Sequence, residues 1–168
     1  LAVATLAVSA ETEGYYTYNI TDGEATITHV ATSISGDVTI PSALGGYPVT
    51  VIGDSAFVSC DELSNVTIHD SVTRIGDYAF IDCNNLTDIM ILSTDVEFVV
   101  SKGYTFGDTA TIYGYTGSTA EAYAEEYGRP FEAIDIGGTC GAEGNEENLK
   151  WGFNPDTGTF VIYGTGAM

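Results

Sequence analysis

The chain has 168 residues, of which 44% are hydrophobic, enough to build the core of one domain and the start of a second. It carries 24 Asp and Glu residues against 4 Lys and Arg residues, so its formal net charge is −20. Lys and Arg supply most of the affinity for nucleic acid and for anionic lipid, so this balance argues against both as partners. The 20 Gly residues and the abundance of Thr, Ile, Val and Tyr predict a mainly β protein.

The first ten residues, LAVATLAVSA, form a short apolar run that ends in the small-x-small pattern of a secretory cleavage site. The run is too short to span a bilayer. We interpret residues 1–10 as the remnant of a signal peptide, with the mature chain starting near Glu11; a buried strand or a lipid-facing anchor is the alternative. The first interpretation predicts export to the extracellular space or the cell wall, and no later segment predicts membrane insertion.

Two strand-like segments follow, at residues 14–20 and 24–30. The turn signal Thr21-Asp22-Gly23 separates them and predicts a β-hairpin. We expect this hairpin to cover the first unit of the repeat that comes next.

Residues 49–68 repeat as residues 72–91, with nine matching positions at a constant offset of 23. The matching pairs are 49/72, 52/75, 53/76, 56/79, 57/80, 60/83, 63/86, 66/89 and 68/91. The register extends backward to Val38 at an offset of 28 and forward to Ile112 at an offset of 23. Residues 95–106 match poorly, and we expect a degenerate or partly looped-out unit there.

A period of this size is typical of a solenoid, in which each turn, or coil, buries its inward side chains only against its neighbours. Alternation along the short strand of each coil predicts which side chains point inward. They are Val38, Ile40, Val66, Ile68, Ile89, Ile91 and Ile112. The Ala-Phe pairs and the repeated Cys should fill the opposite wall. Gly53 and Gly76 follow Ile at the same point of each coil, where we expect a tight turn or a close approach to the neighbouring coil.

The repeat unit I-G-x-x-A-F-x-x-C-x-x-L-x-x-[VI]-x-I resembles the leucine-rich repeat of bacterial surface proteins, the BspA-like type. The resemblance covers roughly residues 38–112, although the unit after Ile91 lacks Ile-Gly, Ala-Phe and Cys. It implies a secreted or wall-associated scaffold for adhesion and recognition.

Beyond the repeat, Ser118 and Glu121 form a capping box that predicts the start of a helix of about ten residues. Gly128 stands where a left-handed residue ends such a helix. The helix should lay a Tyr/Ala stripe over the last coil; its members are Ala120, Tyr123, Ala124 and Tyr127. We expect residues 131–136 to continue as a closing strand.

Gly137-Gly138 marks a boundary, after which residues 149–153 and 159–163 read as strands around the turn Asn154-Pro-Asp-Thr-Gly158. One hairpin is marginal in water, so we interpret residues 137–168 as an incomplete β-rich module of a longer polypeptide. The leucine-rich repeat domain with its caps then comprises residues 11–136.

We find no catalytic constellation in the sequence. His69, Asp70 and Ser71 are adjacent, but adjacency does not create a triad, and no nucleophile elbow is present. Cys60 and Cys83 occupy one repeat position, which favours two buried thiols over a disulfide between coils, and Cys140 lacks an identifiable base. The acidic residues form no recognisable calcium loop, so we expect neither metal nor other cofactor.

The outward positions of successive coils form a strip that becomes apolar and aromatic toward the C-terminus. The candidate ligand-binding residues on it are Thr67, His69, Met90, Leu92, Tyr113 and Tyr115. This strip predicts either a binding face or a surface that the capping helix covers. The leading hypothesis is a non-enzymatic recognition module for a protein or a cell-surface glycan, and the alternative is a spacer that positions another domain.

Overall fold

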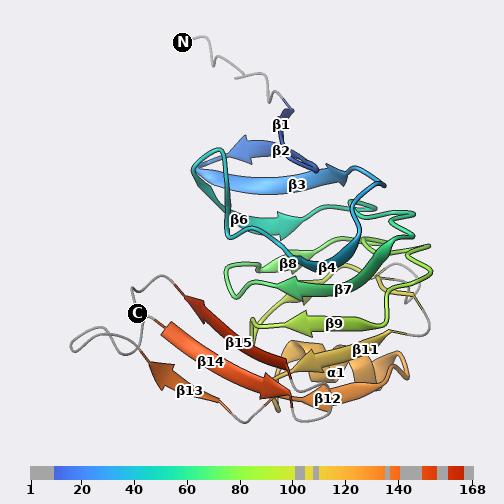
Figure 1. The fold of residues 1–168 in the computed structure, drawn as a ribbon, viewed down its shortest axis with the longest axis vertical. Coiled ribbons are helices and arrows are strands. Elements are labelled where there is room, and N and C mark those ends of the chain that lie inside the picture. The colour runs from blue at the N-terminus through green and yellow to red at the C-terminus, as the bar shows by residue number, and fades with distance from the viewer. Residues whose placement is uncertain are drawn as a thin grey trace, which may run out of the picture.

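A computed structural model describes residues 10–100, 105–107 and 110–134, and the backbone of three further strands at 137–140, 149–154 and 159–164. The predicted signal-peptide remnant lies almost entirely outside these residues. Figure 1 shows the chain winding as a solenoid whose coils stack along the long axis of the molecule. The solenoid that the repeat predicts is confirmed.

A five-stranded parallel sheet with the order β12-β11-β9-β7-β4 forms one wall of the solenoid. Its strands are β4 (Gly36–Thr39), β7 (Leu63–Ile68), β9 (Asp88–Ile91), β11 (Thr111–Gly114) and β12 (Phe131–Ala133). The register pairs residues 38, 66, 89 and 112 in succession, as the offsets 28, 23 and 23 predict. All predicted inward side chains are buried except Val38, which is half-buried on the edge strand.

A second sheet of seven strands forms the facing wall, with the order β1-β2-β3-β6-β8-β10 and with β5 paired to β6. Its strands are β1 (Glu11–Glu13), β2 (Tyr16–Thr21), β3 (Glu24–Val30), β5 (Ala43–Leu44), β6 (Tyr47–Ile52), β8 (Arg74–Ile75) and β10 (Glu97–Phe98). Apart from the N-terminal hairpin, the sequence did not predict this sheet, because several of its other strands are only two residues long. The Ala-Phe and Cys positions lie mainly in the turns between the two sheets.

The predicted N-terminal hairpin is confirmed as β2 and β3. Asp22 and Gly23 have φ angles of 53° and 84°, and positive φ at both central residues is what a tight hairpin turn requires. The side chains of Ala25, Ile27 and Val30 in β3 are buried. The hairpin therefore covers the first coil, and β1 adds an antiparallel strand outside it.

An aromatic column runs through the solenoid from the hairpin to the C-terminal helix. Phe57 stacks on Phe80 with ring centroids 4.5 Å apart, and Phe80 lies 5.5 Å from Phe106. Tyr16 closes the column at one end, 6.4 Å from Phe57, and Tyr123 closes it at the other, 5.6 Å from Phe106. Aromatic pairs at these distances stabilise a core beyond their burial.

The irregular coil after Ile91 follows the same path with a different sequence. Phe98 pairs with Ile75 at the offset of 23, but Phe106 pairs with Phe80 at an offset of 26. The coil lacks the Ala-Phe pair of the repeat, as the sequence indicates, but Phe106 fills the position of the repeated Phe three residues late. Residues 101–104 lie outside the described part of the chain.

Helix α1 (Thr119–Glu126) closes the array where the capping box predicts it, and it spans eight residues instead of about ten. The Ser118 hydroxyl accepts a hydrogen bond from the Glu121 backbone N–H, and the Glu121 carboxylate accepts one from the N–H of Gly117. Gly128 has a φ of 61°, and the Arg129 N–H donates to the Ala124 carbonyl. This pattern is the Schellman motif that ends a helix at a left-handed Gly.

Gly53 and Gly76 both lie where a coil approaches its neighbour. A Cβ at residue 53 would sit 2.8 Å from the Ile27 carbonyl oxygen, and one at residue 76 would collide with the backbone nitrogen of Asp54. The close approach is confirmed, and neither residue has a positive φ.

The C-terminal strands β13 (Gly137–Cys140), β14 (Leu149–Asn154) and β15 (Thr159–Gly164) form a separate antiparallel sheet. Two of them confirm the strands predicted on either side of the Asn154–Gly158 turn, which lies mostly outside the described residues. The closing strand predicted at residues 131–136 is observed as β12, residues 131–133. No helix within the described ranges is long and apolar enough to cross a membrane.

Candidate binding surface

The outer face of the five-stranded sheet carries the six residues that the sequence singles out. Thr67 of β7 pairs with Met90 of β9, and Met90 pairs with Tyr113 of β11. His69, Leu92 and Tyr115 each follow two residues later along the chain. Because parallel strands in register align their side chains, the six residues form two adjacent columns across β7, β9 and β11.

Burial divides this face into an accessible part and a covered part. Leu92 and Tyr113 are only 3% and 7% exposed, and they form a cluster with Ile134 against which Met90 and Tyr115 pack. Thr67, His69, Met90 and Tyr115 are partly exposed. The buried side chains of α1 belong to the interior cluster instead, so the capping helix does not cover this strip.

A polar column that the sequence analysis missed runs beside the first one. The Asn65 side-chain amide donates to the Asp37 carboxylate over 2.6 Å. The Thr87 hydroxyl lies 3.3 Å from the Asn65 side-chain oxygen and 2.6 Å from the Asp88 carboxylate. The bonds of Asn65 to Asp37 and to Thr87 tie successive coils together on the outside. The offsets 28 and 23 applied to residue 37 would have located the column.

His69, Asp70 and Ser71 are close together but do not form a catalytic triad. The Asp70 carboxylate lies 2.8 Å from His69 Nδ1, and the Ser71 backbone N–H points to that same nitrogen at 3.2 Å. The Ser71 hydroxyl donates to the carbonyl of Val49. A triad places the nucleophile and the carboxylate on opposite ring nitrogens, whereas all three contacts here involve Nδ1 or the backbone.

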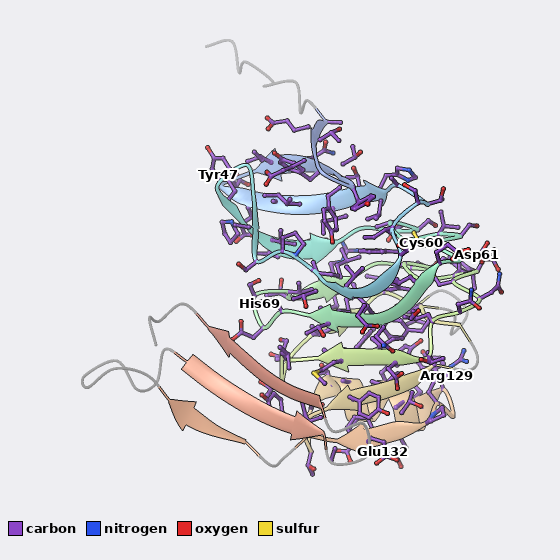
Figure 2. All side chains as sticks on the ribbon, in the orientation of Figure 1. Tyr47, Cys60, Asp61, His69, Arg129 and Glu132 are labelled. Atoms are coloured by element: carbon purple, nitrogen blue, oxygen red, sulfur yellow. The ribbon has the colours of Figure 1, made fainter. Side chains whose placement is uncertain are left out.

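The turn that carries Asp61 lies at the edge of the five-stranded sheet opposite to His69, as the labels of these two residues in Figure 2 show. There the Asp61 carboxylate accepts from the side-chain amide of Asn84 over 2.7 Å, and the Asp61 carbonyl accepts from that of Asn85 over 2.6 Å. Among the residues whose side chains are described, no group of three His, Cys, Asp or Glu residues is arranged to hold a metal ion.

The clearest shifts in pKa occur in the interior. Burial, reinforced by the proximity of Cys60, raises the pKa of Tyr16 to about 12. A hydrogen bond to Cys60, together with burial, raises the pKa of the Cys83 thiol. Both cysteines are buried and free. These groups stabilise the packed core in their neutral forms and lie away from the candidate surface.

Comparison with known proteins identifies the repeat. The family described as "BspA type Leucine rich repeat region (6 copies)" matches residues 33–112. The crystal structure of a leucine-rich repeat protein from Bacteroides capillosus ATCC 29799 shares 30% identity with the chain, covers 63% of it and is itself covered to 98%, with a TM-score of 0.50. The chain belongs to the BspA-type leucine-rich repeat family.

Two further crystal structures resemble this BspA-type chain. A leucine-rich cell surface protein from Faecalibacterium prausnitzii A2-165 shares 30% identity over 79% of this chain and 32% of that chain, with a TM-score of 0.45. A leucine-rich repeat protein from T. pallidum shares 18% identity over 62% and 71%, with a TM-score of 0.41. No curated protein matches the chain.

Membership of the BspA-type family is consistent with a binding or recognition module. Repeats stacked in this way present an extended face built from several coils. The family does not specify a partner, so any choice of binding residues must come from the surface itself.

Proposed function

We propose that this domain is a non-enzymatic recognition module of an exported bacterial surface protein, and that it binds a protein or a glycan through the outer face of the five-stranded sheet. The observation that carries the proposal is the register of β7, β9 and β11, which aligns Thr67, Met90 and Tyr113 in one column. The apolar run at residues 1–10 and the family membership support the location.

In this proposal the contact is made by the partly exposed residues of the face, which are Thr67, His69, Met90 and Tyr115. Leu92 and Tyr113 support Met90 from within their small cluster. Hot spots of binding are surrounded by groups that exclude water and are held in place by packing. The hydrogen-bonded polar column beside them would form one border of the contact.

The test is a Thr67→Arg variant of the whole chain, because a long charged side chain near the C-terminal end of β7 would block the face without disturbing the core. The fluorescently labelled protein is applied to a printed glycan array and, by flow cytometry, to intact epithelial and bacterial cells. Thr73→Arg is the matched control, since Thr73 is exposed on the other side of the solenoid, beside β8.

We expect Thr67→Arg to weaken binding to any responding glycan or cell at least tenfold and Thr73→Arg to change it less than twofold. Equal binding by wild type and Thr67→Arg would remove this face from consideration.

The alternative function, a structural spacer, is favoured by the separate sheet β13–β15 that follows the solenoid. The length of a spacer sets the distance between the domains on either side of it. A spacer would therefore tolerate Thr67→Arg, whereas insertion of a further 23-residue coil would change the activity of the larger protein.

A further inference from the structure

A cleft of about 280 Å³ opens between α1 and β10, away from the outer face of the five-stranded sheet. Figure 1 shows α1 behind β11, on the side of the seven-stranded sheet. The residues that define the chemistry of the cleft are Phe98, Thr119, Tyr123, Glu126 and Tyr127. The volume is slightly below the range for ligand pockets, about 300 to 1,000 Å³, and is suited to one side chain.

Three aromatic rings lie in a row along this cleft. Phe98 and Tyr123 stack with centroids 4.5 Å apart at an interplanar angle of 27°, and Tyr127 lies 4.9 Å from Tyr123 with its ring tilted by 39°. Phe98 and Tyr127, at the two ends of the row, are partly exposed. The face of an aromatic ring carries partial negative charge, which attracts a cation placed over it.

The end of the helix adds further negative potential. Glu126 lines the cleft in the last turn of α1, and no basic residue occupies that turn. The C-terminus of a helix carries about half a negative charge, so a carboxylate there is unfavourable unless a cation accompanies it. Burial, the charge of Glu126 and a hydrogen bond to the Glu126 side chain all raise the pKa of Tyr127.

The Tyr123 hydroxyl is a second, independent indication of a ligand. Tyr123 is 4% exposed, and its hydroxyl is buried without a hydrogen-bond partner in the structure. Buried polar groups are nearly always paired, so an unpaired one needs an explanation. A ligand with N–H donors would satisfy the phenol oxygen once the Tyr123 side chain turns to expose that oxygen to the cleft.

We propose that this cleft binds the guanidinium group of an arginine side chain on a protein partner. A guanidinium is planar and stacks on aromatic faces, and its five donors suit a bidentate bond to Glu126 and a further bond to Tyr123. An ammonium group cannot stack, and a quaternary ammonium cannot donate to the phenol. The inference rests on the proposed function in one respect, that the partner is a protein, but it uses a different face of the solenoid.

The probe for this site is N-acetyl-arginine amide, titrated into the isotope-labelled whole chain and followed by NMR. N-acetyl-citrulline amide has a similar shape without the charge, and N-acetyl-lysine amide has the charge without the planar group. We expect shifts confined to the rings of Phe98 and Tyr127 and to the C-terminal turn of α1. Arginine amide should bind at least fivefold more tightly than either analogue.

Glu126→Gln should weaken arginine binding at least fivefold, because it removes the carboxylate from the cleft. Glu125→Gln is the matched control, since it makes the same change of charge on the adjacent helix residue, which does not line the cleft, and should alter binding less than twofold. Tyr123→Phe removes one hydroxyl and should weaken binding about threefold. Circular dichroism spectra verify that each variant is folded.

Equal loss in Glu126→Gln and Glu125→Gln would overturn the proposal, because it would show general attraction to an acidic surface. Equal binding of the arginine and lysine probes, or stronger binding of methyl glucoside, would also overturn it. Thr67→Arg should leave arginine binding intact. Failure of the proposal for the cleft and failure of the proposal for the strand face can therefore be told apart.

Discussion

The two regular coils at residues 49–91 and the irregular coil that follows reach the same packing with different sequences. In the regular coils Phe57 and Phe80 stack at an offset of 23, whereas Phe106 continues the column at an offset of 26. Phe106 is as deeply buried as the other two. Packing of the interior therefore requires a side chain of suitable size at each position in space. A spacing of 23 residues is only one way for the chain to place such a side chain there.

The glycine position explains where the two kinds of coil diverge. Gly76 donates its N–H to the Ile52 carbonyl, and Val99, 23 residues later, donates to the Ile75 carbonyl in the same way. A Cβ at residue 76 would collide with Asp54, yet Val99 carries a larger side chain at the equivalent point. Both residues keep the same backbone hydrogen bond, and the extra three residues of the irregular coil lie between Val99 and Phe106.

The largest expected effect tests whether both kinds of coil belong to one cooperative core. Phe80→Ala and Phe106→Ala should each lower the free energy of unfolding by about 3–5 kcal/mol, because each leaves a cavity in the aromatic column. Urea unfolding followed by circular dichroism measures both. The exposed Tyr47 provides a control, and Tyr47→Ala should cost less than about 0.5 kcal/mol.

A loss below about 1 kcal/mol for Phe106→Ala, with a full loss for Phe80→Ala, would contradict this view. The irregular coil would then be a loosely attached appendage of the regular ones.

The regular coils were predictable from the sequence, and much of the irregular one was not. Nine matches at one offset are enough to predict the register of β7 against β9, and the strand pairing agrees with it. The place of Phe106 in the aromatic column was not predicted, because its offset of 26 differs from the repeat period. Strands as short as Arg74–Ile75 were not predicted, because two residues cannot show an alternating pattern.

The candidate binding surfaces, too, were only partly predictable from the sequence. Adding the repeat offset placed Thr67, Met90 and Tyr113 in one column, as the structure has them. The sequence did not reveal that Tyr113 is buried with Ile134. Nor did it reveal the cleft beside Tyr123, because Phe98 and α1 meet only through tertiary packing.

The glycine that separates the two coil types should give the next largest effect. Gly76→Ala should destabilise the protein by about 1–3 kcal/mol, because the new methyl group forces the coil away from Asp54. Gly107→Ala is the matched control in the irregular coil, where nothing lies within 4 Å of a Cβ and φ is not positive. It should be neutral or slightly stabilising, by up to about 1 kcal/mol. Equal melting temperatures for the two variants would disprove the steric explanation.

The helix cap that closes the irregular coil should contribute less. Ser118→Ala removes the hydroxyl that accepts the Glu121 N–H and should cost about 1 kcal/mol. Thermal unfolding measures the change, and Ser35→Ala, at an exposed position just before β4, is the control. No difference between the two variants would mean that the end of the array frays before the protein unfolds.

The smallest expected effect concerns the other end of the aromatic column, where Tyr16 covers Phe57. Its pKa of about 12 lies above the ordinary value of 10.0, so the folded protein holds a proton that the unfolded chain releases. Stability from Tyr16 is therefore complete below pH 10 and is lost as the pH rises toward 12. Between pH 10 and pH 11 the loss should be about 0.5–1 kcal/mol. Tyr16→Phe should remove this component from urea unfolding curves, whereas Tyr15→Phe, at a residue 49% exposed, should retain it. Identical pH slopes for both variants would show that the hairpin leaves Tyr16 open to water, unlike Tyr123 at the irregular end.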